Sequence, residues 1–179
     1  MNSKHLIWSL TAATLLTLAV RVVRSEGSQH ANHDLGTLPA AVRQATERFL
    51  DVSNAIAAGY VQAPVCVSGP EQGAMGIHYV KTTLFDGRLS VDEPEALVYE
   101  PKKNGQLELV AIEYITPADA WHGSHAPGVQ PDLMGHLFHY IPGPNRYGPA
   151  AFYELHVWAW KNNPHGEFAD WNPNVSCAG

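Results

Sequence analysis

Five short apolar runs, each bounded by turn-forming residues such as Gly, Pro and Asp, constrain the fold of this chain most strongly. They span residues 73–80, 95–101, 106–117, 135–141 and 151–160. Runs of this length between turn-forming residues are typical of β-strands. Between the second and third runs, Asn104 and Gly105 supply the positive φ angles of a tight hairpin turn. Consecutive strands joined in this way predict a mostly antiparallel sheet.

A helical stripe precedes these runs. Its apolar residues recur at spacings of 3, 4, 3 and 4, at Val42, Ala45, Phe49, Val52 and Ile56. Thr37 can cap such a helix, Pro39 is tolerated in its first turn, and Gly59 is a natural end. The sequence therefore predicts an α+β fold, with an N-terminal amphipathic helix packed on a mostly antiparallel, curled sheet or small β-barrel.

The first 25 residues have the pattern of a signal peptide. Lys4 precedes an uncharged run of 15 residues, 6–20, which is short for a bilayer span of about 20. Val23 and Ser25 occupy the small-residue positions of a cleavage site. Because arginines flank that site, an uncleaved anchor is the alternative. We expect cleavage, and a protein that is periplasmic or secreted and has no membrane segment afterwards.

The rest of the chain has two parts. Residues 26–36 are polar and predict a flexible lead-in, whereas residues 37–179 suit a single globular domain. Without residues 1–25 the chain carries 8 Lys and Arg against 17 Asp and Glu, a formal charge of −9. Nucleic-acid binding needs clustered basic residues, so we expect no nucleic-acid partner.

Cys66 and Cys177 are the two cysteines of the chain. In an exported protein an even pair indicates a disulfide, and this one would close a loop of about 110 residues. Thiolate metal ligands, the alternative, need partners at CxxC-like spacing, and the sequence has none. We predict the disulfide.

Polar residues interrupt the apolar runs where a core strand would carry Val or Leu. Glu113 lies in a run that is apolar on both faces, which indicates a central strand and a buried carboxylate. Such a group is costly unless it is paired, protonated or bound to a metal. Glu154 and His156 project to one face of the last run, about 6–7 Å apart. His78 and His139 lie within two further runs.

Three histidines on three strands, with a buried glutamate on a fourth, can assemble a metal site in a curled sheet. We predict a transition-metal ion (Zn, Cu, Fe, Mn or Ni) held by His78, His139, His156 and Glu113. The protein would bind the metal alone or act as a metal-dependent enzyme on a small molecule, with Glu113 or Glu154 as general base.

Other classes of function stay open. The histidines can instead hydrogen-bond to backbone carbonyls as separate structural residues. A non-metal binding module would then hold a small apolar molecule in an aromatic-lined pocket, with Trp and Tyr side chains as its walls. A structural envelope protein without a small ligand is a third hypothesis. Metal content separates the first hypothesis from the other two.

Four segments carry a likeness to other proteins: GAMGIHYV, PEALVYEP, LVAIEYITPADAW and AFYELHVWAWKNNPHGEFADWNP. Through them the chain resembles an uncharacterised family of exported bacterial proteins, over about 130 residues that end at Cys177. The resemblance implies export and a single domain. It brings no activity with it.

Overall fold

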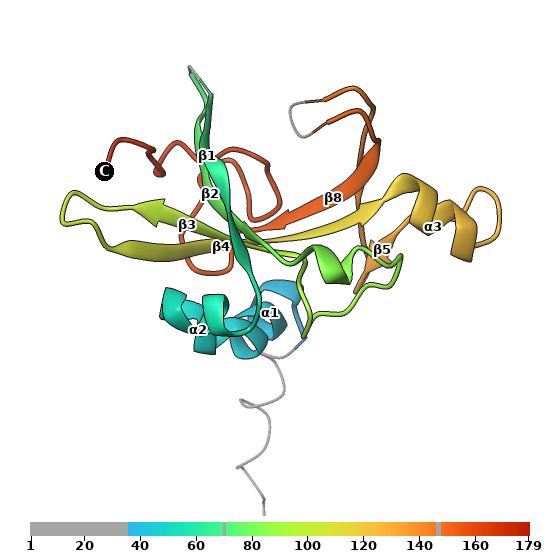
Figure 1. Ribbon diagram of the computed structural model, residues 1–179, viewed down its shortest axis with the longest axis horizontal. Helices are drawn as coiled ribbons and strands as arrows, with labels where there is room; N and C mark the ends of the chain where they lie inside the picture. Colours follow the sequence, from blue (N-terminus) through green and yellow to red (C-terminus); the bar gives the residue numbers. More distant parts are fainter. Residues whose placement is uncertain (1–35, 70, 146–147) are drawn as a thin grey trace, which may run out of the picture.

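The computed structural model describes residues 36–69, 71–145 and 148–179 (Figure 1). The predicted signal peptide, residues 1–25, and residues 26–35 of the predicted lead-in lie outside this part. Within the described ranges, no helix has the length and apolar character needed to cross a membrane.

The predicted amphipathic helix is broken into shorter pieces. The structure has α1 at Leu38–Thr46, a 3₁₀ turn at Glu47–Leu50 and α2 at Val52–Ala57. The break lies at Asp51, whose backbone is extended (φ −93°, ψ 113°) and whose carboxylate caps the backbone N–H of Ser53. Because the helix restarts there, the apolar stripe no longer lies on one face. Ile56, expected in the core, is 57% exposed.

The strands form a curled antiparallel sheet, which confirms the predicted α+β class. Its six strands follow the order β1-β2-β3-β4-β8-β7. Their bounds are Val61–Gly69 (β1), Gly73–Val80 (β2), Ala96–Pro101 (β3), Leu107–Pro117 (β4), Phe152–Val157 (β8) and His139–Ile141 (β7). A 3₁₀ turn at Thr82–Leu84 follows β2, and α3 at Ala118–Ser124 follows β4. In the described part the sheet is open, with β1 and β7 at its edges.

Two features of the sheet depart from the prediction. The run at 135–141 does not form one strand, since β6 (His136–Leu137) pairs with β5 (Asp132–Leu133) in a separate small sheet. Between β6 and β7 the buried Phe138 donates its N–H to the carbonyl of Pro131, which continues the pairing of β5 with β6. Strand β1 was not predicted because its sequence has only a weak apolar pattern. In the structure its pairing with β2 is irregular.

One face of the sheet packs against α1 and α2 (Figure 1). Alternate side chains of the central strands build this core with the helices, among them Tyr79, Leu97, Tyr99, Ile112, Tyr114 and Leu155. The buried Tyr99 hydroxyl donates to the carbonyl of Phe49, 2.7 Å away, and so ties the helical layer to β3. This face is therefore occupied by the fold itself.

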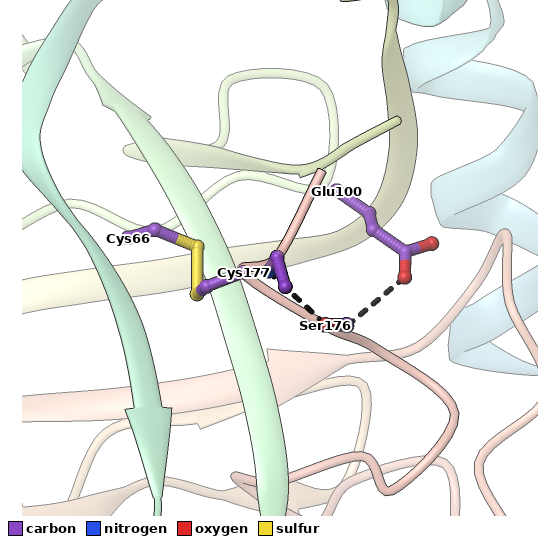
Figure 2. The surroundings of a disulfide bond; sticks show 5 residues. Cys66, Glu100, Ser176 and Cys177 are labelled. Atoms are coloured by element: carbon purple, nitrogen blue, oxygen red, sulfur yellow. Dashed lines mark hydrogen bonds between the residues drawn. A yellow bond between two sulfur atoms is a disulfide. The ribbon is translucent and has the colours of Figure 1, made fainter. Parts of the chain in front are cut away.

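The opposite face is covered in part by the chain after β8. Trp158 and Val175 of that segment pack on Val98 and Ala111 of the central strands. The predicted disulfide is confirmed: Cys177 is bonded to Cys66 of β1 (Figure 2). Next to it the Ser176 N–H donates to a carboxylate oxygen of Glu100, 3.0 Å away. These contacts hold the C-terminal segment over the face that carries the predicted site.

Candidate metal centre

Three of the four predicted ligands meet on the face opposite the helices. Glu113 of β4 lies directly across from His156 of β8 in the strand register. Glu113 Oε2 is 3.1 Å from Nε2 of His78, and its Oε1 is 3.9 Å from Nε2 of His156. One potential ligand atom from each residue lies within 4.8 Å of the other two. The three side chains can therefore share one ion.

The contact between His78 and Glu113 crosses an intervening strand. His78 is on β2 and Glu113 is on β4, so β3 lies between them. The residue of β3 opposite Glu113 is Ala96, which is fully buried, and the one opposite His78 is Val98. A methyl group at position 96 leaves room above β3 that a larger side chain would fill. The contact between the His78 imidazole and the Glu113 carboxylate is therefore diagonal, between residues that lie opposite different residues of β3.

The three residues are almost completely buried. His78, Glu113 and His156 are 2%, 1% and 1% exposed. In the described part of the chain, Glu113 Oε1 and both ring nitrogens of His156 have no hydrogen-bond partner. A buried polar atom without a partner costs about 1–3 kcal/mol. Several buried polar atoms without hydrogen-bond partners are costly in an apolar core, and a bound ligand would give them partners.

The protonation states favour cation binding. Burial lowers the pKa of His156, and His78 adds to this effect, while the carboxylates of Glu113 and Asp170 oppose it. His156 is therefore a neutral imidazole at pH 7. Burial pushes the pKa of Glu113 upward, but the His156 and His78 rings outweigh burial and hold that pKa below its ordinary value. A carboxylate and a neutral imidazole are the forms in which these side chains ligate metals.

The fourth predicted ligand, His139, does not join this group. Its side chain is 58% exposed on the edge strand β7, and its Nδ1 is 3.4 Å from Oδ1 of Asp170. The same Asp170 oxygen is 3.9 Å from Nδ1 of His156. Asp170 thus stands between the two imidazoles. His139 is connected to the buried group through Asp170 and His156 rather than by direct contact with Glu113.

Glu154, predicted as a possible general base, is buried beside His156 on the same face of β8. It is 4% exposed and lies opposite His139 in the register. With His156 and Asp170 it forms a second set of potential ligand atoms within 4.8 Å of one another. The predicted residues are thus divided between two adjoining groups that share His156.

The sequence analysis missed two acidic residues of this region. Asp170 lies in the loop after β8, in the segment FADWNP, where no strand pattern marks it as buried or near a histidine. Glu95 precedes β3 and is 1% exposed, and its carboxylate accepts the N–H of Ile115 at 3.0 Å. It begins the predicted strand run 95–101, where nothing in the sequence marks its side chain as buried. In both cases only long-range packing reveals the burial.

A cavity of about 400 Å³ opens beside the three converging residues. His78 and Glu113 line it, and His156 does not. The other lining residues in the described part of the chain are Ala63, Val80, Thr82, Phe85, Ile115, Pro117, Gly148, Pro149, Ala150, Ala151 and Phe152. An ion held by the three side chains would therefore have two of its ligands in the cavity wall, with the cavity as its approach.

Among the described residues, the Trp and Tyr side chains expected around a ligand pocket do not line this cavity. The aromatic lining residues in that part of the chain are Phe85 and Phe152. Three tryptophans are instead fixed by hydrogen bonds elsewhere: Trp121 to Val129, Trp158 to Ala169 and Trp160 to Thr46. Their indole groups serve the packing of loops and helices.

Comparison with known proteins gives no relative: no family model, no curated protein and no solved structure matches this chain. The function has to be argued from the site.

Proposed function

We propose that this is an exported protein that binds one transition-metal ion through His78, Glu113 and His156 and acts on a small molecule that reaches the ion from the adjoining cavity. The observation that carries the proposal is the convergence of these three buried side chains, with potential ligand atoms within 4.8 Å of one another. A metal ion would provide partners for the atoms of Glu113 and His156 that find none in the described chain.

The donor set indicates the class of metal. Two imidazoles and one carboxylate suit Zn, Fe, Mn, Ni or Cu and are a poor match for Ca or Mg, which prefer oxygen ligands. Three protein ligands leave coordination positions open, as in catalytic sites and unlike closed structural sites. When bound, such an ion would polarise a substrate or lower the pKa of a water molecule.

Individual residues around the site can be assigned further roles. His78 and Glu113 present their side chains to the cavity, so they fix where a bound molecule meets the site. Glu154, buried next to His156, is the candidate general base. Asp170 Oδ1 lies 3.9 Å from Nδ1 of His156, where its charge would orient the ring once the metal binds the other nitrogen. Export is supported by the Cys66–Cys177 disulfide, since such bonds persist in oxidising compartments.

The second candidate is a binding module that uses the same cavity without metal. The cavity volume and its apolar wall favour this reading. It leaves the converging atoms of Glu113 and His156 without an explanation. Metal binding is therefore the better-supported function.

Metal content measured by mass spectrometry on untagged protein tests the proposal. We expect about one equivalent of a single transition metal, lost in His156→Ala and in Glu113→Gln. His165→Ala, which removes an exposed histidine in a turn, is the matched control and should keep the metal. Circular dichroism and thermal unfolding would establish that each variant is folded. Wild-type protein that takes up no metal after incubation with Zn, Cu, Fe, Mn and Ni would refute the proposal.

A further inference from the structure

The cavity beside the site has walls of almost entirely hydrocarbon character. Val80 of β2 and Ile115 of β4 form its sheet side, and Phe85, Pro149 and Phe152 enclose it from the following loops and the start of β8. Its volume of about 400 Å³ lies in the range of small-molecule sites, about 300–1,000 Å³. A molecule inside would bury apolar surface, at about 25 cal/mol per Å².

Charge is confined to one end of this cavity. Among the lining residues of the described chain, His78 and Glu113 are the ionisable ones, and Thr82 adds a hydroxyl. No lining residue there is Lys or Arg. In metal-free protein an anionic group there would meet the negative charge of Glu113, whereas a metal ion held by the site would attract it. A cationic ligand would lose its hydration between hydrocarbon walls.

We infer that the cavity binds a mainly hydrocarbon molecule whose single polar group points at His78 and Glu113. This inference names the class of substrate for the proposed function. Binding of the molecule does not depend on that function, whereas any reaction of the molecule does. Apolar walls provide affinity, and the polar group at one end fixes the orientation. The acidic and imidazole side chains then meet the ligand at one position instead of along its length.

Binding can be measured with a neutral apolar fluorophore, N-phenyl-1-naphthylamine, whose emission rises on transfer from water to an apolar site. The titration is run on metal-loaded protein and on protein stripped with a chelator. Displacement by 1-octanol, octanoate and octylammonium then compares ligands with the same chain and different charge. We expect saturable binding in both forms. In the stripped protein 1-octanol should displace the probe at a concentration at least tenfold lower than either ion, because Glu113 repels octanoate and the hydrocarbon walls disfavour octylammonium.

Two substitutions test whether the probe binds in this cavity. Val80→Phe and Ala63→Leu both add carbon atoms at its wall without replacing a proposed ligand, so either one that folds can carry the test. Each should weaken probe binding at least tenfold. Val129→Phe is the matched control, because Val129 is 45% exposed and does not line the cavity. It should leave binding unchanged.

The outcomes separate this inference from the metal proposal. Probe binding to a protein that takes up no metal would refute the metal proposal and support the inference. Metal uptake without probe binding would support the metal proposal and refute the inference. In the stripped protein, stronger displacement by octanoate than by 1-octanol would overturn the placement of the polar group beside Glu113. Equal probe binding by the filled variants would show that the probe binds elsewhere.

Discussion

Glu95 should make the stability of this protein fall as the pH rises through neutrality. Its side chain is 1% exposed, and burial raises its pKa from 4.5 to about 8. The hydrogen bond from the Ile115 N–H opposes this rise, and the charges of Asp86 and Glu113 add to it. The folded protein therefore holds this proton at pH values at which the unfolded chain has released it.

The direction and size of the effect follow from proton linkage. Below the unfolded pKa of 4.5 both states are protonated, and Glu95 costs no stability. Between that value and about 8 the folded state binds the extra proton, so the free energy of unfolding decreases with pH. The difference between the unfolded and folded pKa values of Glu95 corresponds to about 5 kcal/mol of unfolding free energy in total. Of this, about 1–2 kcal/mol is lost between roughly pH 6.5 and 8, where the folded carboxyl begins to ionise.

The interval above pH 6.5 isolates Glu95 from the metal site. His156, whose pKa is lowered, contributes a change of opposite sign, of which only about 0.4 kcal/mol remains above its unfolded value of 6.5. Glu113, whose pKa is also lowered, adds stability that is lost only as the pH falls below 4.5. Neither group therefore accounts for a decrease in stability between pH 6.5 and 8.

Glu95→Gln tests this reasoning because the amide oxygen can still accept the Ile115 N–H and cannot ionise. Urea unfolding at pH 6.5, 7, 7.5 and 8 should show a declining free energy for the wild type and a flatter profile for the variant. Glu93→Gln, an exposed substitution two residues away, should follow the wild type. Equal slopes for the wild type and Glu95→Gln would show that Glu95 is ionised in the folded protein and would refute the argument.

Three further predictions concern the site and its support. Asp170→Asn should weaken metal binding about 10- to 100-fold in a competition titration, because its carboxylate orients His156; an unchanged affinity would remove that role. Ala96→Leu should fill the space above β3 and lower metal affinity at least tenfold while circular dichroism stays unchanged, and undiminished affinity would show that this space is not needed. The double variant Cys66→Ser/Cys177→Ser should lose about 5 kcal/mol in urea unfolding, since the bond spans 111 residues; a loss below about 1 kcal/mol would contradict the chain-entropy estimate.

The local signals in the sequence predicted most of the secondary structure. The run at 73–80 is strand β2 with the same bounds, and the third run is β4 within one residue. Alternation along a strand also placed Glu154 and His156 on one face, because side chains in a strand alternate whatever surrounds them. The helical stripe was less reliable. Its periodicity continues past Asp51, whereas the backbone turns there and rotates the following residues away from the core.

The sequence by itself determined which side chains could ligate a metal, which strands carry them, and that two cysteines were available to pair. Only the tertiary structure decided which of these groups meet. His78 reaches Glu113 across β3, a contact that depends on strand order and on the small Ala96 between them. His139 faces Asp170 instead, because β7 is an edge strand and the segment after β8 folds back beside it. Strand order and register are set by contacts between residues far apart in the chain, and no local pattern records them.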